Sequence, residues 1–238
     1  MEESKDKIVS YYDQFAEQQE VTGINSRHLQ ILDKLVDAGL KEHHKILEVG
    51  CGIGTVSHLL ASYVKKGKVL AVDISPESIK KAQDLWKDQK NLEFAVSDMS
   101  DFERDDEFDF FVFPDVLEHI PVDQHPPLFK TVRKHAHENS AIFVHIPAPR
   151  FLEWMIRNEP QKLQVIDQPL DSGDLIKNIT TAGFYLEKME TYSIFYNEKD
   201  YQYFVFRSAK DLNETHSLSK WQVLKERIRI RLRHRIFS

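Results

Sequence analysis

The chain has 238 residues, within the range of one α/β domain with additions, and its 41% hydrophobic content is enough to bury a substantial core. No apolar stretch approaches the length that a membrane span needs, and the polar start MEESKDK lacks the pattern of a signal peptide. The one cysteine, Cys51, cannot form a disulfide within the chain, which favours a reducing compartment. We therefore expect a folded cytoplasmic protein.

The charge is unevenly distributed. The formal net charge is −6, but residues 215–238 hold seven Lys or Arg and one Glu, so this tail carries about +6 and the rest of the chain about −12. The body should repel polyanions, whereas the tail should attract them.

Two helices are predicted first. Residues 4–19 place Ile8, Tyr11, Tyr12 and Phe15 on one stripe, and Asn25 caps a second helix that ends before Gly39.

After residue 44, short apolar runs alternate with amphipathic segments. The runs at 45–49, 68–72, 92–96, 108–113 and 140–146 predict buried strands, and those at 54–64, 76–87, 123–137 and 172–182 predict helices. Near-continuous apolar strands separated by helices indicate a parallel sheet covered on both faces. Two further runs, 184–195 and 200–208, predict an antiparallel hairpin that completes a seven-stranded, doubly wound α/β sheet.

Residues 147–170 interrupt this alternation with four prolines and a short aromatic helix. An insertion rich in Trp, Met, Arg and Gln is better suited to substrate recognition than to closing a loop. Within and beside it, we select His145, Arg150 and Trp154 as candidate substrate residues, together with Tyr12 of the first helix.

A glycine-rich turn follows the first strand. The order Glu48-Val-Gly50-Cys-Gly52-Ile-Gly54 lets the backbone approach a ligand closely, and Asp73, at the end of the next strand, can reach a ribose. The spacing differs from the G-x-G-x-x-G of a pyrophosphate clamp, and an acid before the first glycine suits a cationic group.

This run resembles motif I of the class I S-adenosylmethionine-dependent methyltransferases, which have a Rossmann-like fold. The resemblance covers roughly residues 40–147, and three further motifs support it: AVDIS, FAVSDM and FDFFVFPDVLEHIP. It implies S-adenosylmethionine as the cofactor, with Glu48 and the glycines at its methionine end, Asp73 at its ribose and Asp98 at its adenine. The cofactor set is Glu48, Gly50, Cys51, Gly52, Gly54, Asp73, Ile74, Asp98, Met99, Pro114 and Tyr11. The resemblance also suggests that helix 4–19 covers the cofactor as a lid, although its stripe equally fits ordinary core packing.

His119 is the candidate general base. It lies just after the fourth strand, and an unperturbed imidazole pKa near 6.5 suits proton transfer at neutral pH. A structural role for this histidine is the alternative.

The D-x-x-E-H segment is also similar to the E-x-x-E-H segment of metal-assisted O-methyltransferases. That similarity implies an alternative in which Asp115, Glu118, His119 and His145 hold Mg²⁺. Asp115 stands where that pattern has Glu, a shorter reach.

As a helix, the tail would place Trp221, Leu224, Ile228, Leu232 and Ile236 on a stripe flanked by arginines, the composition of a helix that lies on an anionic membrane. The alternation from Arg227 to Ile236 also permits a strand. A docking helix for a partner or a second copy, and a nucleic-acid contact, are the alternatives, the last disfavoured by the acidic body.

These patterns divide the chain into an N-terminal helical lid (1–40), a methyltransferase domain (41–210, with the insertion 147–170) and a basic amphipathic tail (211–238). We expect O-methylation of a hydroxyl on a polar acceptor, such as a sugar or a lipid-linked glycan, at the inner membrane face. N-methylation of a small amine, and a non-catalytic cofactor-binding module that recruits a partner, are the alternatives.

Overall fold

The structure is a computed structural model that describes residues 23–164, 166–210 and 215–234. The helix predicted at 4–19, its role as a lid, and Tyr11 and Tyr12 lie outside the described residues.

The described residues form a seven-stranded sheet in the order β3-β2-β1-β4-β5-β7-β6. The first five strands in the chain are parallel, and β7 runs antiparallel to both of its neighbours, β5 and β6. The predicted mostly parallel sheet with a terminal hairpin is therefore confirmed. The strands are β1 (Lys45–Val49), β2 (Lys68–Asp73), β3 (Leu92–Val96), β4 (Phe108–Pro114), β5 (Ala136–Pro147), β6 (Phe184–Tyr192) and β7 (Tyr201–Ser208).

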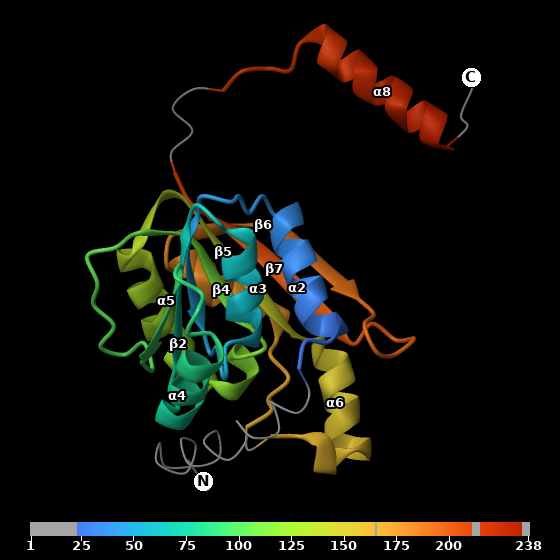
Figure 1. Cartoon of the computed structure of the whole chain (residues 1–238). Coiled ribbons are helices and arrows are strands. Elements are labelled where there is room, and N and C mark those ends of the chain that lie inside the picture. The colour runs from blue at the N-terminus through green and yellow to red at the C-terminus, as the bar shows by residue number, and fades with distance from the viewer. Residues whose placement is uncertain (1–22, 165, 211–214, 235–238) are drawn as a thin grey trace.

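Helices cover both faces of the sheet (Figure 1). On one face lie α2 (Ser26–Asp37), α3 (Thr55–Tyr63) and α4 (Pro76–Leu85), and on the other lie α5 (His125–Lys134) and α7 (Ser172–Thr181). Alternate residues of β4 point to opposite faces, so that Phe110 packs with the first group of helices and Phe111 with the second. The near-continuous apolar runs in the sequence reflect this burial on both faces.

The start of α2 is set by local chemistry. The Asn25 side chain accepts hydrogen bonds from the backbone N–H groups of Arg27 and His28, and His28 Nδ1 accepts one in return from the Asn25 N–H. Ile31 and Leu35 on the same helix are completely buried. This cap fixes the residue at which α2 begins.

Two predicted boundaries were wrong. The strand predicted at 184–195 ends at Tyr192. The helix predicted at 123–137 ends at Lys134, and β5 begins at Ala136, four residues before the predicted strand. Ala136 pairs with Phe108 beyond an irregularity in the ladder, and the polar residues that follow carry no apolar strand signal.

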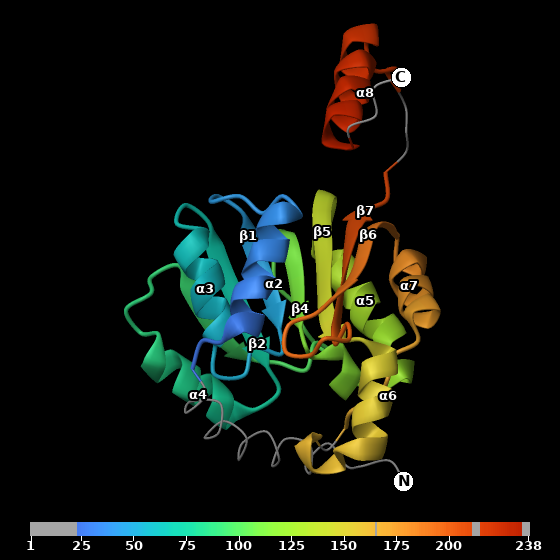
Figure 2. The same cartoon turned by 90° about the vertical axis from the view of Figure 1, so that its right-hand side faces the viewer.

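Helices α6 (Pro149–Asn158) and α8 (Lys220–His234) lie beyond opposite ends of the parallel strands. Helix α6 follows β5 at the carboxyl edge of the parallel strands, whereas α8 lies beyond the opposite edge (Figures 1 and 2). The predicted tail is thus a helix rather than a strand. Among the described helices, none is long and apolar enough to cross a membrane.

Candidate functional site

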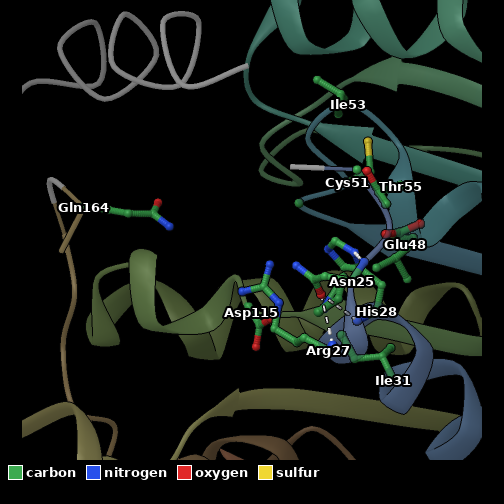
Figure 3. Close-up of a pocket in the computed structure, with 14 residues that line it drawn as sticks. Asn25, Arg27, His28, Ile31, Glu48, Cys51, Ile53, Thr55, Asp115 and Gln164 are labelled. Atoms are coloured by element: carbon green, nitrogen blue, oxygen red, sulfur yellow. Dashed lines mark hydrogen bonds and ion pairs between the residues drawn. The ribbon is translucent and has the colours of Figure 1, made fainter. Parts of the chain in front are cut away.

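The site lies where the strand order reverses. β1 pairs with β2 on one side and with β4 on the other. The connections that follow β1 and β4 therefore leave toward opposite faces of the sheet and open a crevice at the carboxyl ends of these strands. A cavity of about 240 Å³ occupies this crevice, and we call it the switch-point cavity (Figure 3). Its walls come from the turn after β1, the end of β4 and the first turn of α2, and Gln164 reaches in from the opposite side.

Glu48, on β1, is the buried acid of the switch-point cavity. Its side chain is fully buried, and neither carboxylate oxygen has a hydrogen-bond partner in the described structure. Burial, together with the negative charge of Asp73, raises the pKa of Glu48 to about 8. The nearby Ser57 hydroxyl opposes this rise in pKa only in part. A buried carboxyl group with so little hydrogen bonding is costly, so this position fits a ligand that brings a cationic donor.

The glycine turn has no room for side chains. Gly50 has a φ of +77°, and a Cβ there would lie 2.3 Å from Val116 Cγ2. Gly54 has a φ of +80°, and its Cβ would lie 2.6 Å from the ring of Phe94. The glycines therefore let the turn fit between Val116, which follows β4, and Phe94 of β3.

Asp73 holds the glycine turn from β2. Its Oδ2 accepts a hydrogen bond from the Gly52 N–H at 2.7 Å, and its Oδ1 accepts one from the Ser75 N–H at 2.9 Å. The predicted ribose contact stays a prediction, since the carboxylate stands at the expected strand end but is engaged by the backbone.

The predicted cofactor residues that the structure describes divide into two groups. Glu48, Gly50, Cys51 and Pro114 line the switch-point cavity. Gly52, Gly54, Asp73, Ile74, Asp98 and Met99 lie around the turns after β1, β2 and β3, outside its lining. Asp98 accepts hydrogen bonds from the backbone and the hydroxyl of Ser100, at 2.9 and 2.6 Å, and its adenine contact also stays a prediction.

A second cavity, of about 170 Å³, adjoins the first, and we call it the α6 cavity. The turn after β4 contributes Glu118 and His119, and α6 contributes apolar side chains such as Leu152. Both cavities are lined by Arg27, Asp115 and Gln164. Asp115 thus stands at the junction of the two cavities.

Asp115 is held by a buried network. Its Oδ1 accepts from His145 Nδ1 at 2.6 Å, His145 Nε2 accepts from the Tyr192 hydroxyl at 2.8 Å, and Arg27 Nε lies 3.2 Å from Asp115 Oδ2. Although burial opposes ionisation, His145 and Arg27 hold the pKa of Asp115 below its usual range. Asp115 also has a positive φ of 54°, a conformation that L residues adopt only when their surroundings impose it. The junction therefore holds an ionised carboxylate paired with the guanidinium of Arg27.

Glu118 and His119 have less polar surroundings. Burial and the neighbouring Asp115 raise the pKa of Glu118 well above its usual range, and its Oε2 has no hydrogen-bond partner in the described structure. Burial lowers the pKa of His119, and its Nδ1–H donates to the Ile166 carbonyl. The α6 cavity thus contains a carboxyl group whose pKa is raised by burial and an imidazole whose pKa is lowered by burial.

The predicted metal set is not assembled. Within the described residues, no group of three or more His, Cys, Asp or Glu could hold a metal ion. Asp115 and His145 are directed to each other, and His119 Nδ1 is directed to a carbonyl. These contacts correct the prediction that the four side chains converge as ligands.

The predicted substrate residues lie apart from the α6 cavity. His145 is completely buried in the network behind Asp115, Arg150 is exposed, and Trp154 is 39% exposed against Phe151 and Tyr196. The insertion does reach the α6 cavity, but through Phe151, Leu152 and Met155. The role of His145, Arg150 and Trp154 in substrate recognition stays a prediction.

Sequence reasoning missed Arg27, His28 and Gln164, which line the switch-point cavity. The cap at Asn25 fixed where α2 begins, but the direction of its first turn is set by packing of the helix on the sheet. No spacing relates Gln164 to the glycine turn, because the fold brings it across the crevice.

A doubly wound sheet whose switch point holds a glycine turn, a preceding buried acid and an aspartate on the next strand defines a Rossmann-like nucleoside-binding protein. Residues 46–139 match a family model described as a methyltransferase domain. The match covers 94 of the 238 residues, and the predicted resemblance to the class I S-adenosylmethionine-dependent methyltransferases is confirmed.

Over 98 residues, the chain is 30% identical to malonyl-[acyl-carrier protein] O-methyltransferase 1 of Ilyobacter polytropus, a match that covers 41% of this chain and 34% of that protein. The chain spans about a third of the length of the curated relatives that it matches first.

Solved structures share the fold at low sequence identity. Magnesium protoporphyrin IX methyltransferase of Synechocystis PCC 6803 with bound SAH has a TM-score of 0.68 at 17% identity, covering 86% of this chain and 99% of that one. The N-methyltransferase NodS of Bradyrhizobium japonicum WM9 in complex with S-adenosyl-L-homocysteine has a TM-score of 0.61 at 19% identity, covering 77% and 86%.

Proposed function

We propose that this chain transfers the methyl group of S-adenosylmethionine, held in the switch-point cavity, to an acceptor held in the α6 cavity. The observation that supports this most is that the two cavities adjoin and share Arg27, Asp115 and Gln164. Methyl transfer is an in-line displacement, so a donor and an acceptor held in neighbouring compartments meet its main requirement.

The residues of the switch-point cavity fit the methionine end of this cofactor. Glu48 offers two buried carboxylate oxygens without partners, which an ammonium group would satisfy. Gly50 brings the backbone close, and any Cβ there would meet Val116. Asp73 would hold the ribose hydroxyls after exchanging a bond to the turn for one to the ligand.

S-adenosylmethionine supplies a methyl group made electrophilic by its sulfonium. Asp115 places negative charge at the junction of the cavities, where it favours a cationic sulfur. His119, kept neutral by burial, would accept the proton of an attacking hydroxyl as a general base. Arg27 holds the Asp115 carboxylate in place.

We propose a hydroxyl on a polar acceptor, such as a sugar, as the methyl acceptor. The α6 cavity combines the carboxyl group of Glu118 and the imidazole of His119 with apolar surface from α6, which suits a group with both polar and apolar faces. N-methylation of a small amine is the second candidate, favoured by the anionic Asp115 at the junction. A cofactor-binding module without turnover is the third.

The test is His119→Ala, with the exposed His43→Ala as the matched control. We expect both variants to bind S-adenosylhomocysteine as the wild type does by calorimetry. Turnover on a mixture of hydroxyl and amine acceptors, followed by mass spectrometry, should fall roughly 10²- to 10⁴-fold for His119→Ala only.

Unchanged turnover in His119→Ala would argue against a base at this position and favour an amine acceptor. If the wild type binds the cofactor without turnover, the result would favour a cofactor-binding module without activity. If it does not bind the cofactor, the proposed methyl transfer would be wrong.

A further inference from the structure

Helix α8 has no packing partner among the described residues. Every residue from Lys220 to His234 is exposed, including Trp221 at 79% and Leu232 at 60%. Figures 1 and 2 show the helix apart from the sheet and its covering helices. Apolar side chains on a helix of this kind call for a surface outside the described fold.

The helix has one main apolar stripe. Trp221, Leu224, Ile228 and Leu232 follow at intervals of three and four residues and therefore share a side. Lys225 and Arg231 lie on the flanks of that stripe. The helix carries six Lys or Arg and a single Glu, and this Glu226 pairs with Arg229 at 2.6 Å.

This combination of charge and apolar stripe fits one kind of partner best. An anionic lipid interface takes up apolar side chains and attracts basic residues at the same time. A nucleic-acid backbone would pair with the arginines but leave the Leu and Ile side chains in water. A second copy packed through the stripe would bring the two sets of basic residues close together.

We infer that α8 binds an anionic lipid surface through the stripe formed by Trp221, Leu224, Ile228 and Leu232. This inference goes beyond the proposed methyl transfer and does not depend on it.

The direction of β7 determines from which side of the sheet the chain continues to α8. Tyr201 pairs with Pro147 at the carboxyl end of β5, and Arg207 pairs with Ala141 near its start. The chain therefore leaves the body at the edge opposite to Gly50 and Asp115, and nine residues separate Lys210, whose ammonium group contacts Asn139, from α8. The helix thus tethers the body to the surface from the side opposite to the two cavities. A body attached in this way would take its acceptor from the aqueous phase. The inference therefore argues against the predicted lipid-linked acceptor.

The test uses the full chain and sedimentation with vesicles of phosphatidylcholine alone or with about 30% phosphatidylserine. The probe variant is Ile228→Gln with Leu232→Gln, which removes two stripe residues. The matched control is Val223→Gln with Ile230→Gln, which makes equivalent changes off the stripe at residues 43% and 46% exposed. Both variants keep the charge of the helix.

We expect binding to the anionic vesicles and at least tenfold weaker binding to neutral ones. The stripe variant should lose at least tenfold in affinity for anionic vesicles, and the control less than threefold. S-adenosylhomocysteine affinity should be the same with and without saturating vesicles, because the cavities face away from the surface.

Three results would overturn the inference. The first is an equal loss of affinity for anionic vesicles in the two variants. The second is the absence of vesicle binding together with tight binding to a duplex or single-stranded oligonucleotide. The third is a concentration-dependent dimer that only the stripe variant abolishes. A fall in cofactor affinity on vesicles would overturn the proposed orientation.

Discussion

Glu48→Gln is the perturbation that examines the cofactor site most directly. The pKa of Glu48 is raised from 4.5 to about 8, so about 0.9 of a proton is bound to this carboxyl at pH 7. If the ammonium group of the cofactor pairs with the carboxylate, binding must expel that proton. We therefore expect about 0.9 proton to be released per S-adenosylhomocysteine bound at pH 7.

The magnitude of the affinity change follows from two opposing contributions. A hydrogen bond to a charged partner is worth about 1.5–3 kcal/mol, and deprotonating Glu48 at pH 7 costs about 1.4 kcal/mol. Glu48→Gln should therefore weaken binding by up to about tenfold at pH 7. The difference should grow as the pH rises to 8, because wild-type affinity rises and that of the variant stays flat.

The assay is titration calorimetry in phosphate and in Tris, whose ionisation enthalpies differ, so that the difference in observed heat reports protons released. Glu118→Gln is the matched control, since its carboxyl is also buried with a raised pKa but lines the α6 cavity. It should keep the proton release that Glu48→Gln abolishes. No proton release in the wild type would refute the pairing of Glu48 with the ammonium group.

The same shift predicts a dependence of folding stability on pH without ligand. A raised folded-state pKa means that the native protein binds the proton more tightly, so its contribution is fully present below about pH 4.5 and is lost as the pH rises through 8. The full shift corresponds to about 5 kcal/mol, of which about 3.5 kcal/mol should be lost between pH 5 and 8 in urea unfolding of the wild type and not in that of Glu48→Gln.

Gly50→Ala should destabilise the fold by more than 2 kcal/mol in urea unfolding, because its Cβ would meet Val116 in addition to the strain of the positive φ. Gly23→Ala, at a positive φ of 60° with open space, isolates the strain alone, and equal losses in the two variants would contradict the clash. Tyr192→Phe should cost about 1–3 kcal/mol, because it leaves Nε2 of the buried His145 without its 2.8 Å partner. An unchanged midpoint would mean that this nitrogen finds another partner.

Sequence reasoning predicted the sheet well because its signals are local. Apolar runs such as Phe108–Pro114 can only be buried on both faces, and the cap at Asn25 marks where a helix begins. The prediction failed where non-local pairing decides the conformation. The polar residues after Ala136 extend β5 only because β4 provides a partner.

The candidate site likewise combines residues that local motifs predict with residues that only the fold brings together. Glu48, Gly50 and Pro114 could be found because short motifs place them at strand ends, where the fold itself makes a crevice. Arg27 and Gln164 reach the crevice from distant segments, and no motif records their approach. The network of His145 with Asp115 and Tyr192 likewise joins β5, the turn after β4 and β6, so its internal pairing replaced the metal ligation that the spacing suggested.

The contact between Gly50 and Val116 links the two halves of the reaction mechanically. The Val116 side chain, which immediately precedes the Leu117–His119 turn, occupies the place that a Cβ on Gly50 would take, so the glycine turn has little space to shift toward that turn. Occupying one compartment should therefore stiffen the wall of its neighbour. Shortening Val116 would loosen that joint and let two bound molecules drift out of line, even though the valine itself touches no reacting atom.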